Sequence, residues 1–188
     1  MKTIADHLFD ILENSVNAKS SKVIVKISFN NNLFCCQIID NGIPTILENI
    51  TDPFVTSRKT RKVGLGLPLL KATAESTGGY LNLALSCKGR GTRLEFVVNM
   101  KHIDARPFGD LSSVFSDILR SWREVDFELF INKSNEVNGN KILDTAELKK
   151  SLGINTLDDN EILDYVKKHV KEELINIGID NQFGIMLN

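Results

Sequence analysis

The sequence predicts an α+β fold in which helices cover one face of a mixed or antiparallel β-sheet. Three observations support this fold class. Apolar residues recur at helical spacing near the N-terminus, two pairs of short extended segments are typical of β-hairpins, and residues 1–100 follow the order helix, hairpin, long loop, helix, hairpin.

The first helix and hairpin follow from apolar periodicity. Apolar side chains between residues 4 and 16 share one helical face, which predicts a helix over residues 3–16. Residues 22–29 alternate well enough to predict a strand, and three asparagines at 30–32 supply a turn. Residues 33–39 then predict the second strand.

The second helix and hairpin come after a long loop. Residues 40–64 show little regular pattern, and a loop of that length usually has a function or is mobile. A helix is expected to open at residues 64–68, where Pro68 is acceptable at an early helical position, and to end at Gly78-Gly79. Residues 80–86 and 93–99 predict the second hairpin.

The pattern changes after residue 100, so we predict two domains: residues 1–100, and residues 101–188 as a small C-terminal α/β appendage. In the second domain we expect a linker at 105–109, a helix from Asp110 to Trp122, strands at 126–132 and near Ile142, and helices at 145–152 and 157–177. The last helix is expected to begin at a capping-box-like pair, Thr156 and Asp159.

Composition excludes several classes of protein. The 188 residues are 42% hydrophobic and 25% charged, and the net charge of −1 gives no global footprint for nucleic acid or an anionic membrane. No apolar stretch is long enough to span a bilayer, and the N-terminus lacks the pattern of a signal peptide. Three cysteines without zinc-site spacing are interpreted as reduced thiols, so we expect a cytoplasmic protein without nucleic-acid or membrane partners.

The first motif with chemistry lies on the first helix. Asp10 and Asn14 are four residues apart, so they share a helical face one turn apart. Their side-chain oxygens suit a Mg²⁺ ion and a water beside a phosphate chain, because magnesium prefers hard oxygen ligands. Taken alone, the pair is a weak signal, because most acid–amide pairs on a helix belong to a solvated surface.

The second motif, Asp40-Asn41-Gly42, directly follows a strand. A carboxylate at a strand end can accept a hydrogen bond from the exocyclic amine of adenine, and Gly42 would let the backbone approach the ring. An ordinary tight turn is the alternative, because this composition is common in turns.

The third motif combines a cationic loop with glycines at the start of a helix. Arg58 and Lys62 belong to a basic run that leads into Gly64-Leu65-Gly66-Leu67. Backbone N–H groups at a helix N-terminus suit phosphate, and the cations fit a loop that folds over a triphosphate. The alternative is a solvated charged loop; the glycine spacing is neither a P-loop nor a dinucleotide fingerprint.

The fourth motif, Gly89-x-Gly91-Thr92, precedes the last strand of the first domain, where the Thr92 hydroxyl can bond an adenine nitrogen or a nearby water. Together and in this order, the motifs resemble the ATP-binding domain of the GHKL superfamily (gyrase, heat-shock chaperones, histidine kinases, MutL-type repair proteins) over residues 3–99. The matching segments are Asp10–Ser15 (N box), Asp40–Gly42 (first glycine box), Pro53–Thr56 (F box), Gly64–Leu67 (second glycine box), and Gly78-Gly79 with Gly89–Thr92 (final segment).

The resemblance implies a two-layer α/β sandwich of the Bergerat, or histidine-kinase-like ATPase, type that uses ATP and Mg²⁺. It implies that Asn14 holds Mg²⁺, Asp40 reads adenine, and Asp10 stands where gyrase and anti-sigma kinases place a glutamate base. The segment from Arg58 to Leu67 would form a mobile lid. The nucleotide-binding residues implied in this way are Asn14, Asp40, Gly42, Thr56, Arg58, Lys62, Gly64, Leu65, Gly66, Leu67 and Thr92.

Two departures limit the resemblance. Pro44 stands where the first glycine box normally has a second glycine, and its fixed φ and missing N–H change that turn. Only a few residues precede the N box, whereas a histidine kinase carries a phosphoacceptor helix pair there. We therefore expect something other than a complete sensor kinase, and we interpret His7 as a structural residue.

Two functions of different classes remain open. One is a stand-alone protein kinase or ATPase that phosphorylates a separate partner or hydrolyses ATP with Asp10 as base. The other is a catalytically silent module whose lid closes on ATP and gates a partner interaction. The partner or phosphoacceptor is an unidentified protein; we expect residues 101–188 to dock it or to form a homodimer.

Overall fold

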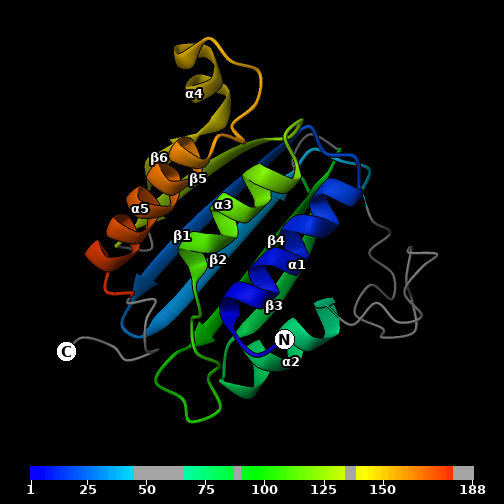
Figure 1. Cartoon of the computed structure of the whole chain (residues 1–188). Coiled ribbons are helices and arrows are strands. Elements are labelled where there is room, and N and C mark those ends of the chain that lie inside the picture. Colours follow the sequence, from blue (N-terminus) through cyan, green and yellow to red (C-terminus); the bar gives the residue numbers. More distant parts are fainter. Residues whose placement is uncertain (45–65, 87–89, 134–138, 180–188) are drawn as a thin grey trace.

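The computed structural model describes residues 1–44, 66–86, 90–133 and 139–179. It has two layers, a six-stranded mixed sheet and a layer of helices (Figure 1). The elements are α1 (Ile4–Asn17), β1 (Lys22–Asn30), β2 (Leu33–Asp40), α2 (Gly66–Ser76), β3 (Tyr80–Leu85), β4 (Thr92–Asn99), α3 (Leu111–Ser121), β5 (Asp126–Asn132), β6 (Asn140–Asp144), α4 (Thr145–Leu152) and α5 (Asn160–Asn176). The predicted α+β class is confirmed.

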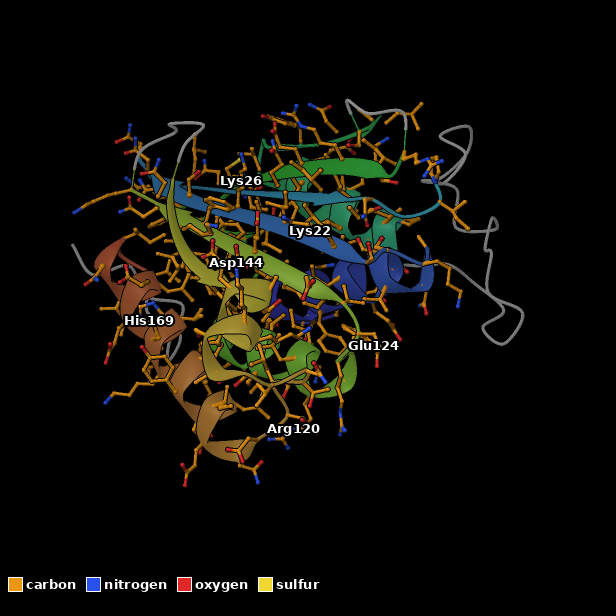
Figure 2. The ribbon with its side chains drawn as sticks, turned by 90° about the horizontal axis from the view of Figure 1, so that it is seen from above. Lys22, Lys26, Arg120, Glu124, Asp144 and His169 are labelled. Atoms are coloured by element: carbon orange, nitrogen blue, oxygen red, sulfur yellow. The ribbon has the colours of Figure 1, made fainter. Side chains whose placement is uncertain are left out.

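The sheet has the order β3-β4-β2-β1-β5-β6, and only the β1–β5 pair is parallel. Helices α1, α3 and α5 lie side by side over one face, and α2 packs beside α1 against β3 and β4 (Figure 1). Viewed from above, the helices lie on one side of the strands (Figure 2). No helix within the described ranges has the length and apolar character needed to cross a bilayer.

Alternating burial explains how the strands attach to the helix layer. In β1, Val23, Val25 and Ile27 are buried against the helices, whereas Ile24 and Lys26 face the other side and are only half-buried. The same period of two runs through β2 and β4 and places the Phe34 and Phe96 rings 5.9 Å apart in the core.

Helix α1 begins with a capping box. Thr3 Oγ1 accepts a hydrogen bond from the Asp6 N–H, and the Asp6 carboxylate accepts one from the Thr3 N–H. Two further donors of the first turn, the N–H groups of Ile4 and Ala5, reach the carbonyls of Pro107 and Phe108 at 2.9 Å. The segment predicted as a linker is therefore packed onto the start of α1.

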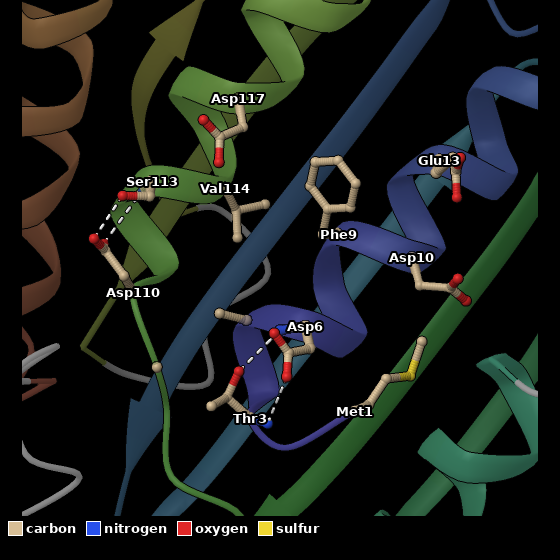
Figure 3. Close-up of a pocket in the computed structure, with 12 residues that line it drawn as sticks. Met1, Thr3, Asp6, Phe9, Asp10, Glu13, Asp110, Ser113, Val114 and Asp117 are labelled. Carbon is tan, nitrogen blue, oxygen red and sulfur yellow. Dashed lines mark hydrogen bonds between the residues drawn. The ribbon is translucent and has the colours of Figure 1, made fainter.

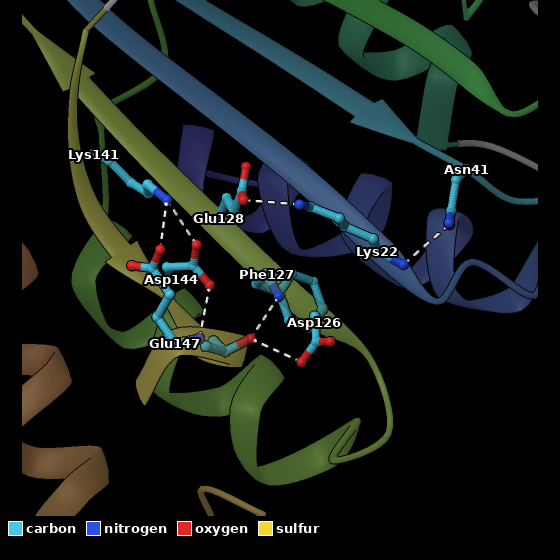
Figure 4. Close-up of polar contacts among 9 residues, drawn as sticks. Lys22, Asn41, Asp126, Phe127, Glu128, Lys141, Asp144 and Glu147 are labelled. Atoms are coloured by element: carbon cyan, nitrogen blue, oxygen red, sulfur yellow. Dashed lines mark hydrogen bonds and ion pairs between the residues drawn. The ribbon is translucent and has the colours of Figure 1, made fainter. Parts of the chain in front are cut away.

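The C-terminal half continues the same sheet. β5 pairs in parallel with β1, from Lys22 opposite Asp126 to Ser28 opposite Asn132. A Lys22–Glu128 ion pair of 2.8 Å joins the two strands on the open face (Figure 4). No local pattern in the sequence indicates this pairing. The division into domains at residues 1–100 and 101–188 stays a prediction.

The start of the last helix was predicted incorrectly. Asp159, not Thr156, is the N-cap of α5, and its carboxylate accepts from the Glu161 N–H at 2.8 Å. The Thr156 hydroxyl instead donates to the Asp158 carboxylate at 2.6 Å. α5 therefore begins at Asn160 rather than at residue 157.

Helices α1 and α2 meet at a buried histidine. His7 is 2% exposed; its Nε2 lies 3.3 Å from the Thr73 hydroxyl, and its Nδ1 has no hydrogen-bond partner in the described part of the chain. Burial is the main cause that lowers the pKa of His7 to about 4, followed by the positive N-terminus. The ring is therefore neutral in the folded protein at neutral pH.

We expect Phe127→Ala to lower the free energy of unfolding by about 3–5 kcal/mol, because it opens a cavity where β5 meets the helix layer. Phe130→Ala, on the open face of the same strand, is the matched control and should cost much less. Denaturant unfolding followed by circular dichroism measures both. Equal losses would contradict the assignment of faces in β5.

We expect acid to destabilise the protein through His7. The folded pKa lies below the unfolded value of 6.5, so this contribution to stability is complete above pH 6.5 and is lost as the pH falls towards 4. The loss should reach about 3 kcal/mol. The difference in unfolding free energy between the wild type and His7→Gln, measured from pH 7 to 4.5, checks this; a difference that does not change with pH would contradict it.

Candidate functional site

Four of the residues predicted for the nucleotide site line one small cavity, of about 50 Å³, below the end of β2. They are Asn14, Asp40, Leu67 and Thr92, from four different elements. The remaining lining residues are Ile11, Ser15, Ala18, Ile38, Leu83 and Leu94. Ligand pockets usually enclose about 300–1,000 Å³, so this cavity by itself can hold only a small part of a nucleotide.

The Asp40 carboxylate is held on three sides. Its Oδ1 accepts from the Gly42 N–H at 2.9 Å and from the Thr92 N–H at 3.2 Å. Its Oδ2 accepts from the Ser15 hydroxyl at 3.4 Å. The residue is only 7% exposed, so this acceptor has a fixed position in a nearly dry setting.

Hydrogen bonds also hold the turn after β2 in place. The Asn41 amide oxygen accepts from the N–H groups of Ser21 and Lys22, both at 3.0 Å, and the Ile43 N–H donates to the Ala18 carbonyl at 2.7 Å. Asp40-Asn41-Gly42 therefore forms a turn, and Asp40 also lines the cavity. The two interpretations of this motif do not exclude each other.

Close backbone packing explains two glycines of the site. A Cβ on Gly91 would lie 1.9 Å from the Asp40 carbonyl oxygen, and the residue has a φ of +83°. A Cβ on Gly42 would lie 2.5 Å from Ser20 Oγ and 2.6 Å from the Ala18 carbonyl oxygen. Gly42 is thus required by the end of α1, and its predicted approach to a purine stays a prediction.

Asp10 lies one turn before Asn14 but faces the start of α2. A Cβ on Gly66, the first residue of α2, would lie 1.8 Å from Asp10 Oδ2. The predicted catalytic residue therefore touches the second glycine box. Asp10 and Asn14 share a helix, but Asp10 does not line the cavity beside Asp40.

A larger groove of about 520 Å³ runs between α1 and α3 (Figure 3). Its carboxylates are Asp6, Asp10, Glu13, Asp110 and Asp117. Two of them, Asp6 and Asp110, cap helices. Burial alone would raise the pKa of Asp6, but hydrogen bonds from the N–H groups of residues 2 and 3 lower it. Burial would likewise raise the pKa of Asp110, but hydrogen bonds from Ser112 and Ser113 lower it to about 2. Asp6 and Asp110 therefore have structural roles, and Asp10 is the only residue of the groove that belongs to the predicted site, so we do not assign the groove as the nucleotide site.

Five predicted site residues, Thr56, Arg58, Lys62, Gly64 and Leu65, lie outside the described residues. Within the described ranges, no three His, Cys, Asp or Glu side chains gather where they would hold a metal ion by themselves.

Sequence reasoning missed the serine and the apolar wall of the cavity. Ser15 directly follows Asn14, and its hydroxyl orients Asp40. Ile38 lies two residues before Asp40, and Leu94 lies two residues after Thr92. Ile38 and Leu94 are opposite each other in the β2–β4 pair. The period of two in each strand is the signal that would have found them.

A family model described as histidine kinase-, DNA gyrase B-, and HSP90-like ATPase matches residues 3–102. No curated protein matches the chain. Among solved structures, the chain is similar to the N-terminal domain of a DNA repair protein, with 13% identity and a TM-score of 0.47 over 77% of this chain and 53% of that one. It is also similar to the Aquifex aeolicus MutL ATPase domain complexed with ADP, with 16% identity and a TM-score of 0.43 over 82% of this chain and 70% of that one.

The chain thus spans about half the length of the first of these structures. The family model, in contrast, matches more than half of the chain, including Asn14, Asp40 and Thr92. The protein therefore belongs to the histidine kinase-, DNA gyrase B-, and HSP90-like ATPase family.

Proposed function

We propose that this chain binds Mg²⁺-ATP in the cavity beside Asp40 and acts in regulation as a protein kinase or ATPase. Family membership supports ATP binding. The observation that carries the proposal is that Asn14, Asp40 and Thr92 line one cavity around a fixed, buried carboxylate. A cytoplasmic location and a separate protein partner, docked by residues 101–188, remain part of the proposal.

The carboxylate has the capacity to bind adenine. An ionised carboxylate offers about four lone-pair sites, and the Gly42 N–H, the Thr92 N–H and the Ser15 hydroxyl occupy three of them. The remaining site suits the exocyclic amine of adenine. The apolar side chains of Ile38, Leu83 and Leu94 would contact the flat purine.

The metal would reach the protein mainly through the nucleotide. Mg²⁺ in nucleotide sites takes one or two protein oxygens and completes its shell with phosphates and water. The Asn14 amide oxygen is a hard ligand on the same cavity wall, which fits this requirement. Bound there, Mg²⁺ would neutralise charge on the phosphates.

Asp10 is the proposed general base. Its carboxylate lies at the N-terminal end of α2, against Gly66, where backbone N–H groups favour phosphate. From there it would polarise a water molecule or a partner's serine hydroxyl near the terminal phosphate. Thr56, Arg58, Lys62, Gly64 and Leu65 are proposed to complete the phosphate side.

We expect Asp40→Asn to weaken ATP binding at least about tenfold, because an amide replaces the buried acceptor at nearly constant shape. Titration calorimetry with Mg²⁺ and ATP measures this, and Asp117→Asn, on α3 in the groove of Figure 3, is the charge-matched control.

Asp10→Asn should keep ATP binding and lose phosphate release. Tight ATP binding without turnover in the wild type would instead support the silent, nucleotide-gated module.

We expect Gly91→Ala to harm both stability and ATP binding, whereas Gly78→Ala should harm only stability. Both residues have positive φ (+83° and +77°), so each alanine costs about 1–2 kcal/mol in conformation. Only the Cβ at position 91 meets the Asp40 backbone; at position 78 nothing lies within 4 Å. Thermal unfolding and calorimetry separate the two effects, and equal ATP affinity in both variants would contradict this expectation.

A further inference from the structure

The two edges of the sheet differ in how they are protected. β6 forms one edge, where Lys141 and Asp144 make an ion pair of 2.8 Å and a register shift lies between Leu129 and Phe130 on its partner strand (Figure 4). Charges and bulges of this kind prevent an edge strand from pairing with another chain.

β3 forms the other edge and lacks these features. Its six residues, Tyr80-Leu81-Asn82-Leu83-Ala84-Leu85, include no charge and no proline, and its ladder with β4 is regular. Tyr80 is 43% and Leu85 50% exposed, and no described segment pairs with the outer side of the strand. Alternate N–H and C=O groups along that side are therefore available for a further strand.

We propose that two copies of this chain pair through their β3 strands, antiparallel and related by a two-fold axis. In an antiparallel pair, opposite residues must point to the same face. Centring the axis on Leu83 puts Leu83 opposite its own copy, Leu81 opposite Leu85, and Asn82 opposite Ala84. Every helix-side pair is then leucine with leucine, and Asn82 and Ala84, which pair on the open face, are small and uncharged.

This self-complementarity favours a second copy over an unrelated strand. A two-fold interface brings each patch against itself, so any charge in β3 would face a like charge nearby. β3 carries none, in contrast to β6. Leu69, 40% exposed on the helix that packs against β3, adds apolar surface near this edge.

The dimer should be weak and concentration-dependent. Stable interfaces bury about 1,200–2,000 Å², and one six-residue strand pair falls below this range. Its formation does not depend on ATP chemistry, so it can be tested whether or not the proposed function holds.

Sedimentation equilibrium of the full chain tests the proposal. The wild type should show a monomer–dimer equilibrium, and Leu85→Lys should raise the dimer dissociation constant at least about tenfold, because an edge lysine blocks strand pairing. Ile103→Lys is the matched control: it replaces another exposed apolar residue, 94% exposed and outside β3, and should leave dimerisation unchanged. Asn82→Lys repeats the test on the open face, and circular dichroism checks that each variant is folded.

Hydrogen exchange of the wild type provides a test that does not depend on the variants. The alternate amides of Tyr80–Leu85 that face away from β4 should exchange more slowly at high than at low protein concentration. A wild type that stays monomeric up to its solubility limit would overturn the proposal. So would a dimer that both β3 variants form equally well, or concentration-dependent protection confined to other elements.

Discussion

The position of the Asp40 carboxylate is the constraint on which the site depends. One buried side chain accepts hydrogen bonds from α1, from the turn after β2 and from the first residue of β4. Because a buried carboxylate without donors is costly, these contacts tie the three segments together before any ligand binds. The same hydrogen bonds therefore stabilise the fold and fix the proposed adenine acceptor.

Close backbone contact is the second property of this region. Gly42 lies against the end of α1, Gly66 against Asp10, and Gly91 against the backbone of Asp40. At each point a single methyl group would occupy space that another group already fills. The glycines of the motifs are thus explained by packing among the elements of the site, in addition to any contact they make with phosphate or purine.

Local patterns predicted most of the elements but not how the two halves join. The helix at 145–152 and the strand at 126–132 agree with α4 and β5, because each has a clear period and a polar start. The parallel pairing of β5 with β1 has no local signal, since it depends on contacts between distant segments. In the candidate site, motif order predicted Asn14, Asp40 and Thr92, which line one cavity, whereas Ser15 was missed because its contact with Asp40 appears only when α1 and β2 are packed together.

The ribosome makes β5 long after β1, and this order has a consequence for synthesis of the protein. β1 lies inside the finished sheet, but its neighbour on one side is encoded about a hundred residues downstream. While the ribosome is still extending the chain, the edge of β1 has no partner and exposes apolar residues to other nascent chains. Nucleation of the native topology must also wait for a contact of high sequence separation, which slows folding. Chaperone protection during translation would therefore matter more for this chain than for a domain that ends at β4.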